Sequence, residues 1–554
     1  MILARRSFLT AASLSALPRA AWAQNLSAGV FTHGVASGDP VSDGVILWTR
    51  FAHSGEGRLA WEIAEDEAFT RMVGRGDTSA SFANDFCAKV DVRGLAPERH
   101  YFYRFLSASG PSPTGQTMTA PREGGERLTV AVFSCSNFPF GYFHAYGHAA
   151  QRADIDLVLH TGDYIYEYGR GIYPSEADAV PGRLIDPVRE TVTLQDYYQR
   201  YALYHTDPDL QELRRLKPLS AVWDDHELTN NTWRDGAQNH QDYEGDFAQR
   251  MAAAAKAYFD WMPIRRPAPS GLRLYRHLDW GDLARIILLD ARLIGRDQQL
   301  DYRAVLTGPA AEGPAAASAA IAEFRHTTLD NANRTLLGAA QEAWLADTLV
   351  QSKQRGQRWQ IITQQMVVAD QYFPQGMSAL LSDGASANTR RWVAAGETIG
   401  ALGLGWNLDA WSGYPAARTR LLEACAVAAS NAVILGGDSH NCWLNNLPAP
   451  NGGRLAAIEF AGGSVTSPGF ERTFSNTGEG EREALMRSGN PQLAWCDVSR
   501  RGYGVLRFTR EGCRAEWNAF DDVRRPEPGN VHAHVIESAA SESAGPGPWT
   551  AAVP

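Results

Sequence analysis

Short apolar runs of strand length alternate with helical stretches from about residue 128 onward. The apolar runs occupy 128–133, 157–159, 221–223, 286–290, 359–362 and 433–435. The helical stretches occupy 246–261, 341–353 and 416–429. Such alternation is typical of α/β layers, in which helices cover the faces of a sheet. We therefore predict an α/β fold for this part of the chain.

The region from about 28 to 120 has a different pattern, with strand-like runs separated by turns. Segments 45–50 and 59–63 are rich in branched and aromatic residues, and 100–105 alternates. Short strands at close intervals predict a small all-β sandwich of immunoglobulin or fibronectin type III character. Prolines and a glycine pair between 111 and 125 indicate a linker after it.

These patterns divide the chain into segments. We expect a targeting segment at 1–23, the all-β domain at 24–122, an α/β domain at 127–530 and a flexible tail at 531–554. The stretch 304–322 is rich in Ala, Gly and Pro, which predicts a surface insertion.

The first 23 residues have the composition of an export signal. A twin arginine at positions 5 and 6 precedes a mildly apolar stretch, and Ala21-Trp22-Ala23 fits a small-x-small cleavage site. We expect the twin-arginine export machinery to be a partner and the mature protein to be periplasmic or secreted. No later segment has ~20 consecutive apolar residues, so we expect no transmembrane segment.

Composition narrows the function classes. The chain has 554 residues, of which 44% are hydrophobic and 21% charged, as in a globular protein. Its net charge of −10 disfavours nucleic acids and anionic membranes as partners. The six cysteines include no CxxC pair, which makes a zinc ribbon unlikely. Export would permit disulfides, but their pairing stays open.

Polar side chains gather just after three of the predicted strands. Asp438 and His440 follow 432–435, Asp163 and Tyr166 follow 157–159, and an Asp-Asp-His-Glu run follows 219–223. Ligands of open α/β sheets bind at the carboxyl ends of strands. Carboxylate and imidazole groups converging there predict a metal site.

Five segments that follow predicted strands have to be read together: FSCSN at 133–137, GDYIY at 162–166, DDHE at 224–227, IITQQM at 361–366 and GDSH at 437–440. Their order and positions resemble the metallophosphoesterase superfamily, and most closely its PhoD-like branch of alkaline phosphatases and phosphodiesterases. The segments GVASGDP at 34–40 and DAWSGYPAAR at 409–418 are also similar to that branch. The resemblance implies a calcineurin-like metallophosphoesterase β-sandwich flanked by helices, preceded by the small all-β domain.

The resemblance also implies a binuclear or larger centre of Fe³⁺ and Ca²⁺. Cys135 takes the place of the superfamily's first aspartate, and the expected ferric ligands are Cys135, Tyr166 and His440. Asp163 is expected to bridge two metals. As a ligand, Cys135 would not join a disulfide.

The second metal position is expected to be rich in oxygen. Asp225 and Asp438 stand where the superfamily has Asn and His, which favours calcium over zinc. Asn231 and Gln365 are expected as further ligands there or as substrate contacts. His226 is expected to be the general acid.

We therefore expect an exported phosphoric ester hydrolase that cleaves phosphodiesters and phosphomonoesters by means of a metal-bound hydroxide. A phospholipase D-type phosphodiesterase acting on lipid headgroups is a close alternative. A non-catalytic calcium-binding adhesion protein is an alternative from another class, and the retention of His226 and of the ferric ligands argues against it. A phosphotriesterase or a nuclease is a third, and the negative charge weakens the nuclease.

Overall fold

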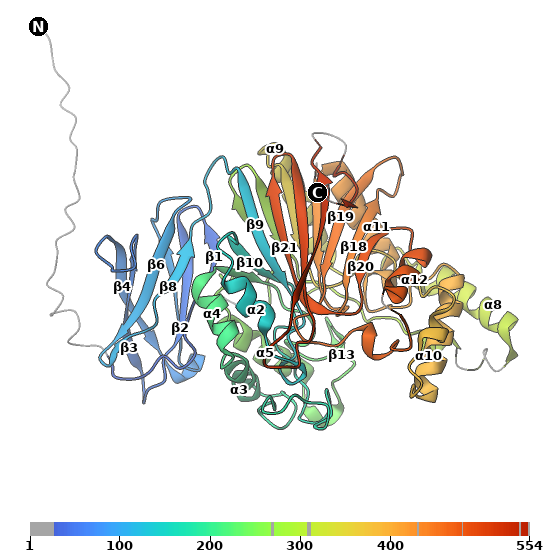
Figure 1. The fold of residues 1–554 in the computed structure, drawn as a ribbon, viewed down its shortest axis with the longest axis horizontal. Coiled ribbons are helices and arrows are strands. Elements are labelled where there is room, and N and C mark those ends of the chain that lie inside the picture. The colour runs from blue at the N-terminus through green and yellow to red at the C-terminus, as the bar shows by residue number, and fades with distance from the viewer. Residues whose placement is uncertain are drawn as a thin grey trace, which may run out of the picture.

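The computed structural model describes residues 27–267, 271–306, 308, 312–428, 431–478, 480–541 and 545–551. The expected export signal at 1–23 lies outside these residues. A small all-β part forms one end of the molecule, paired sheets form its middle, and helices α8 (Pro314–Phe324) and α10 (Ala387–Ala401) form the other end (Figure 1). Among the described residues, no helix has both the length and the apolar character that crossing a bilayer requires.

The all-β part is a sandwich of two antiparallel sheets. One face consists of β1 (Val35–Val41), β2 (Gly44–Arg50) and β5 (Cys87–Arg93). The other consists of β3 (Gly57–Ala64), β4 (Met72–Ala80), β6 (His100–Ser107), β7 (Gly110–Pro111) and β8 (Gly115–Met118). Inward apolar side chains such as Leu47, Ile63 and Tyr103 form its core. The alternation seen in the sequence arises from this burial on one face of each strand.

The strand β1 also joins the all-β part to the rest of the chain. It pairs in parallel with β11 (Leu219–Ala221), with Gly38 opposite Leu219. A Cβ on Gly38 would lie 2.2 Å from the Leu219 carbonyl oxygen and 2.1 Å from that of Pro263, so only glycine fits this contact. Next to it, Asp39 accepts hydrogen bonds from the Arg276 guanidinium at 2.8 and 2.9 Å.

A ten-stranded sheet therefore runs through both parts, in the order β24-β23-β22-β21-β9-β10-β11-β1-β2-β5. Its further strands are β9 (Arg127–Phe133), β10 (Leu157–His160), β21 (Arg501–Thr509), β22 (Gly512–Phe520), β23 (Val531–Ala539) and β24 (Thr550–Ala551). Strands β9, β10 and β11 are parallel, so their carboxyl ends lie at one edge.

A second sheet of seven strands has the order β14-β15-β16-β17-β19-β18-β20. Its strands are β14 (Arg276–Trp280), β15 (Ala284–Leu288), β16 (Trp359–Thr363), β17 (Ala432–Gly436), β18 (Cys442–Pro448), β19 (Leu455–Gly462) and β20 (Leu493–Asp497). Strands β15, β16, β17 and β19 are parallel. Their side chains are buried on both faces and mostly apolar, with Arg285, Gln360 and Glu459 as buried exceptions. A small hairpin, β12 (Thr232–Trp233) with β13 (Gly236–Ala237), lies apart from both sheets.

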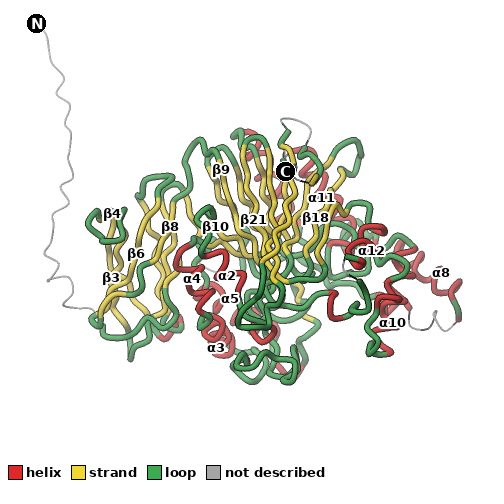
Figure 2. The backbone as a smooth tube through the Cα atoms, viewed as in Figure 1, coloured by secondary structure: helices red, strands yellow, loops and turns green. Residues whose placement is uncertain are grey.

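Helices flank the paired sheets or lie beyond them at one end of the molecule (Figures 1 and 2). They are α2 (His144–Ala150), α3 (Leu194–Tyr204), α4 (Pro208–Leu216), α5 (Phe247–Trp261), α6 (Tyr302–Leu306), α9 (Ala339–Gln354), α11 (Pro415–Ala428) and α12 (Glu481–Gly489), besides α8 and α10. The apolar core continues between the two sheets, where Val132 and Phe460 are both fully buried. The predicted α/β sandwich with a preceding all-β domain is confirmed.

The tail expected to be flexible from 531 is in part a strand. Residues Val531–Ala539 form β23, paired with β22 along its whole length. Its side chains are mostly exposed or half-buried, so the ladder of backbone hydrogen bonds, more than apolar burial, holds it in place. The insertion expected at 304–322 includes most of α8, which ends at Phe324 and buries Ile321 and Phe324.

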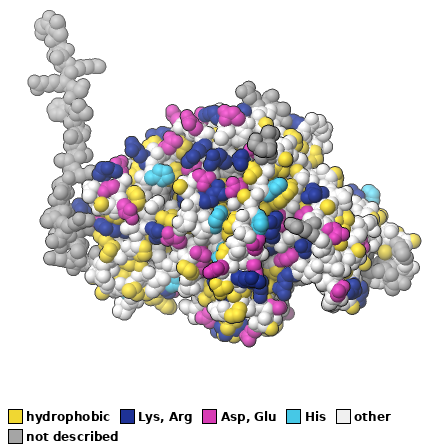
Figure 3. Space-filling model, in the orientation of Figure 1, with side chains coloured by type: hydrophobic (Ala, Val, Ile, Leu, Met, Phe, Trp, Pro, Cys, Tyr) yellow, Lys and Arg dark blue, Asp and Glu magenta, His cyan; other side chains and the backbone are white. Residues whose placement is uncertain are grey.

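Basic and acidic side chains are interspersed on the face seen in Figure 3. Exposed ion pairs include one between neighbouring strands, Arg514 on β22 with Glu537 on β23 at 3.2 Å. Exposed pairs of this kind contribute little stability.

Candidate metal centre

The carboxyl ends of the parallel strands in both sheets converge on one set of polar side chains. Cys135 follows β9, Asp163 follows β10, Asp225 follows β11, and Asp438 and His440 follow β17. Their donor atoms form three overlapping groups, and within each group the atoms lie within 4.8 Å of one another. The groups are Cys135/Asp163/His440, Asp163/Asp225/His226 and Asp224/Asp225/Asp438.

The backbone at this place is unusual. Among the described residues, ten non-glycine residues have positive φ, and five of them are Cys135, Asp163, Asn231, Asp438 and His440, at 50–61°. The left-handed conformation costs about 1–3 kcal/mol at such residues and persists where the surroundings impose it. Four of the five residues lie in the turns that follow β9, β10 and β17, and such outliers cluster at functional sites.

The first group includes a tyrosine. The Tyr166 hydroxyl lies 3.1 Å from Asp163 Oδ2 and 3.3 Å from His440 Nε2, and it accepts a hydrogen bond of 2.7 Å from Ser467. His440 Nδ1 lies 2.9 Å from the Pro468 carbonyl oxygen. A proton on Nδ1 satisfies that carbonyl, so the Nε2 lone pair faces Tyr166 and Asp163.

Burial controls the protonation of this group. It raises the pKa of Cys135 and of Tyr166, and neighbouring Asp163 raises both further. It lowers the pKa of His440 to about 3. A thiol, a phenol and a neutral imidazole are thus favoured without a cation, and a bound cation would displace the first two protons.

The second group is built around His226. Its Nδ1 lies 2.7 Å from Glu167 Oε2, and its ring stacks on Tyr166 at 4.3 Å. Asp225 accepts a 2.6 Å hydrogen bond from the Asn231 backbone N–H. Burial works to lower the pKa of His226, but Asp225, Glu167 and Asp163 outweigh it and raise that pKa well above its ordinary value.

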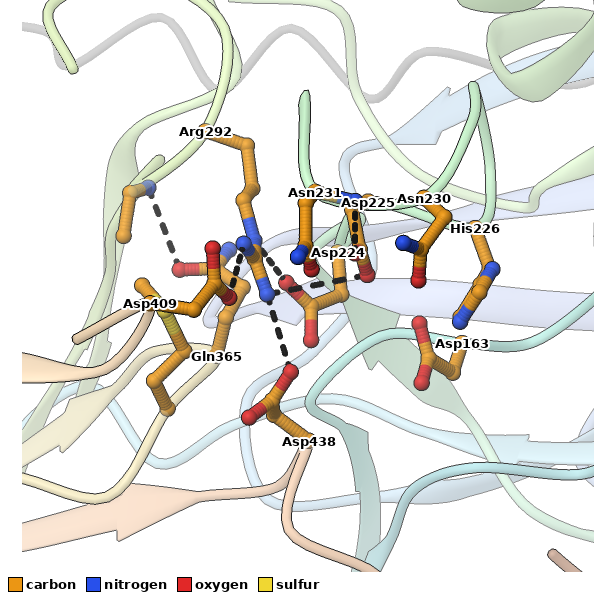
Figure 4. A network of polar contacts seen from close by, with 12 residues as sticks. Asp163, Asp224, Asp225, His226, Asn230, Asn231, Arg292, Gln365, Asp409 and Asp438 are labelled. Carbon is orange, nitrogen blue, oxygen red and sulfur yellow. Dashed lines mark hydrogen bonds and ion pairs between the residues drawn. The ribbon is translucent and has the colours of Figure 1, made fainter. Parts of the chain in front are cut away.

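A buried arginine ties the third group together (Figure 4). Arg292 bonds Asp224, donates to Asp409 at 2.7 Å and to Asp438 at 2.9 Å, and lies 3.6 Å from Asp225. Its side chain is fully buried. One guanidinium therefore faces four carboxylates.

The carboxylates of this group have divergent pKa values. Burial raises the pKa of Asp224 to about 8 and that of Asp438 to about 7, although Arg292 opposes both shifts. For Asp225, burial is outweighed by Arg292 and His226, which hold its pKa at about 2. The carboxylates of this cluster therefore outnumber the arginine side chains that pair with them.

Three buried carboxylate oxygens in this cluster lack a hydrogen-bond partner among the described residues: Asp163 Oδ1, Asp224 Oδ2 and Asp225 Oδ1. Buried polar atoms are rarely left unpaired, and each exception calls for an explanation. Two of the three belong to residues shared between donor groups, where a cation would meet them. The donor set therefore fits at least two metal ions.

The Glu227 side chain connects two of the loops that form the site. Its carboxylate accepts backbone N–H groups of Asp163 at 3.0 Å, Tyr164 at 2.7 Å and Asp224 at 2.8 Å. Burial raises its pKa to about 8. The loops after β10 and β11 are thereby fixed relative to each other.

The structure brings together all the expected ligands and His226, but it uses Gln365 differently. The Gln365 amide oxygen accepts from Ala291 N at 3.1 Å, and its nitrogen donates to the carbonyls of Trp223 and Leu289 at 2.7 and 3.0 Å. Because both ends bond backbone, this side chain connects strand ends and is not free for a metal or substrate. Asn231 does reach the site, through its N–H.

Sequence reasoning missed five contributors: Asp224, Arg292, Asp409, Glu167 and Glu227. A signal existed for Arg292, because it follows the predicted strand at 286–290 as the other site residues follow theirs. Asp224 was adjacent to a residue already chosen. Glu167 follows the expected ligand Tyr166, and no local signal marks it as the partner of His226.

The fold and the donor groups define an α/β sandwich protein with a candidate metal centre. Residues 130–517 match the family model described as PhoD-like phosphatase, and residues 16–121 match its N-terminal domain. The chain belongs to the PhoD-like phosphatase family, which makes it a phosphoric ester hydrolase.

Two individual relatives support the same family assignment. The chain is 35% identical over 522 residues to alkaline phosphatase D of Bacillus subtilis (strain 168), covering 91% of this chain and 80% of that protein. A solved structure described as PhoD has a TM-score of 0.75 and 29% identity, covering 96% of this chain and 94% of the other.

Proposed function

We propose that this protein is an exported hydrolase of phosphodiesters and phosphomonoesters with an iron and a calcium site. The observation that carries the proposal is the sharing of Asp163 and Asp225 among three donor groups at one sheet edge. Shared carboxylates suit a pair of cations, and paired cations suit a phosphate ester, which carries charge on several oxygens.

Ligand chemistry supports the assignment of metals. Cys135, Tyr166 and His440 offer thiolate, phenolate and imidazole donors that suit Fe³⁺, with Asp163 between the two positions. Asp225 and Asp438 offer oxygen alone, which suits Ca²⁺. When bound, such cations neutralise phosphate charge and acidify a coordinated water.

His226 is proposed to protonate the leaving group. Glu167 at 2.7 Å fixes the ring through Nδ1, so Nε2 is directed toward Asp163 and the other carboxylates (Figure 4). The negative neighbours favour the protonated ring, which is the form that donates. As a metal ligand instead, His226 would be neutral at Nε2, and metal content would then depend on it.

A substrate panel tests the activity. Bis(4-nitrophenyl) phosphate and 4-nitrophenyl phosphate are compared at several pH values, with phosphatidylcholine as a lipid substrate. We expect turnover of both chromogenic esters, faster at alkaline pH. Turnover of phosphatidylcholine alone would favour the phospholipase D-type alternative. Absence of all turnover in a metal-replete preparation would favour the calcium-binding adhesion protein.

Export is proposed from the twin arginine at positions 5 and 6. Changing Arg5 and Arg6 together to Lys is expected to leave the protein in the cytoplasm of a host that has the twin-arginine machinery. Unchanged appearance outside the cytoplasm would contradict this route.

A further inference from the structure

A large cavity lies beside the metal centre. Its volume is about 1110 Å³. Pockets that hold drug-sized ligands measure about 300–1,000 Å³, so a phosphate group alone would leave most of this space empty. The cavity is large enough for the organic part of a phosphate ester.

The inner end of the cavity reaches the centre itself. Asn231 and Asp409 both line it. The Asn231 N–H donates to Asp225 at 2.6 Å, and Asp409 accepts from Arg292 at 2.7 Å. The cavity therefore adjoins the carboxylate cluster, which leaves room there for the organic group of an ester bound at the centre.

One face of α10 forms a wall of the cavity. The lining residues on this helix are Asn388, Arg391, Trp392, Ala395, Gly396 and Ile399. Their spacing of three and four positions places them on a single helical face. A Cβ on Gly396 would lie 2.1 Å from Phe373 Cδ2, so this glycine allows Phe373 to pack against the helix.

Three aromatic side chains meet at this wall. Phe373 stacks on Trp406, with centroids 5.1 Å apart and planes 9° apart, and Trp392 meets both rings at nearly right angles. Phe373 is buried, whereas Trp392 is 44% exposed. The aromatic pair thus fixes Trp392 while leaving much of its surface free to contact a ligand.

The polar part of the lining is mostly uncharged. Six amide side chains contribute: Asn231, Gln238, Gln298, Gln299, Asn388 and Asn407. Asp301 pairs with Arg303 at 2.9 Å, and Asp409 pairs with Arg292 and Arg296. Arg391 donates to Asn388 at 2.9 Å. Amides combined with aromatic surface suit a ring whose edges carry uncharged donors and acceptors.

We infer that the cavity binds the organic group of the phosphate ester, and that this group is a flat ring with uncharged polar edges, of the nucleoside class, stacked on Trp392. The inference rests on the proposed function and adds its substrate class. The cavity would favour those phosphodiesters whose retained organic group, the one that does not leave in hydrolysis, is such a ring.

Two diesters with the same leaving group test it: thymidine 5′-(4-nitrophenyl phosphate) and ethyl 4-nitrophenyl phosphate. Because 4-nitrophenolate leaves from both esters, the ratio of their kcat/KM values measures how much the retained group, thymidine or ethyl, contributes through the cavity. We expect a ratio of about ten or more in favour of the thymidine ester, as stacking on an aromatic side chain provides. The ratio should fall about tenfold in Trp392→Ala and be largely kept in Trp392→Phe.

The matched control is Phe82→Ala, since Phe82 is an aromatic residue of the all-β part that is 76% exposed. It should keep the wild-type ratio. A wild-type ratio near one, or a ratio unchanged in Trp392→Ala, overturns the inference while hydrolysis of the ethyl ester keeps the proposed function. If neither ester is cleaved, saturation-transfer NMR with thymidine decides, and equal signals for wild type and Trp392→Ala overturn it.

Discussion

Tyr166 and His440 lie 274 positions apart in the sequence, yet the Tyr166 hydroxyl and His440 Nε2 are 3.3 Å apart. The contact joins the loop after β10 in one sheet to the loop after β17 in the other. Both loops turn through a residue in the left-handed conformation, Asp163 in one and His440 in the other, and these turns bring the two side chains together. The packing of the two sheets therefore creates the candidate centre.

The Glu167–His226 contact predicts a separation of activity from metal binding. The Glu167 carboxylate lies 2.7 Å from His226 Nδ1, where its negative charge orients the ring and favours its protonated form. Glu167→Gln removes that charge. We expect kcat to fall about 10- to 100-fold with metal content unchanged. Glu190→Gln is the control, because Glu190 bonds Arg250 and Asn239 and not His226. Metal loss that parallels the activity loss would identify His226 as a ligand.

Arg292 predicts a stability that depends on cations. Arg292→Met leaves Asp224 and Asp438 buried without their guanidinium partner. In metal-free protein we expect the free energy of unfolding to fall by about 3–5 kcal/mol, as when one member of a buried ion pair is removed. Added calcium should recover part of it. Arg355→Met, at an exposed pair with Asp279, should cost no more than about 1 kcal/mol. Equal losses in the two variants, measured by denaturant unfolding, would argue against this role.

The joint between the all-β part and the large sheet predicts a specific requirement for glycine. Gly38→Ala forces a Cβ against two backbone carbonyls, at 2.1 and 2.2 Å. We expect a loss of about 1–3 kcal/mol in unfolding free energy, as for other overpacked sites. Gly384→Ala is the matched control, since no atom lies within 4 Å of a Cβ there. Similar melting temperatures for the two variants would be inconsistent with the close contact.

His33 predicts part of the pH dependence of stability. Burial, with help from Arg50 and Arg214, lowers its pKa from 6.5 to about 4. Between these values the unfolded chain binds the proton and the folded chain does not, so stability falls as the pH drops from 6.5 toward 4. His33→Gln should make this fall less steep, by up to about 1.4 kcal/mol per pH unit. Urea unfolding at several pH values measures it, and identical slopes would contradict the prediction.

Much of the fold and site could be predicted from local sequence. Apolar runs followed at once by polar residues identified Asp163 and Asp438, because a buried strand and the turn after it are both local features. Cys135 was assigned as a ligand only through the resemblance to a known family. The missed strand β23 is half-exposed and contains two histidines, so no alternating apolar pattern marks it. Its hydrogen-bond partner β22 stabilises it, and pairing is not a local property.

The remaining errors concern side chains with distant partners. The carboxylates that Arg292 bonds directly lie 68 to 146 positions from it, and one sequence carries no record of such contacts. Gln365 was assigned to the site, although its side chain bonds backbone groups instead. An amide after a strand suits a metal, a substrate or a backbone carbonyl equally well, and only the positions of Trp223 and Leu289 decide among them.

Elemental analysis of the purified protein and two variants tests the central claim most directly. We predict iron and calcium in the wild type, loss of iron with calcium kept in Cys135→Ala, and loss of calcium with iron kept in Asp438→Ala. The iron-loaded wild type should show a visible tyrosinate charge-transfer band that is absent in Tyr166→Phe. Zinc as the only metal, or the same losses in both variants, would contradict two chemically distinct cation sites.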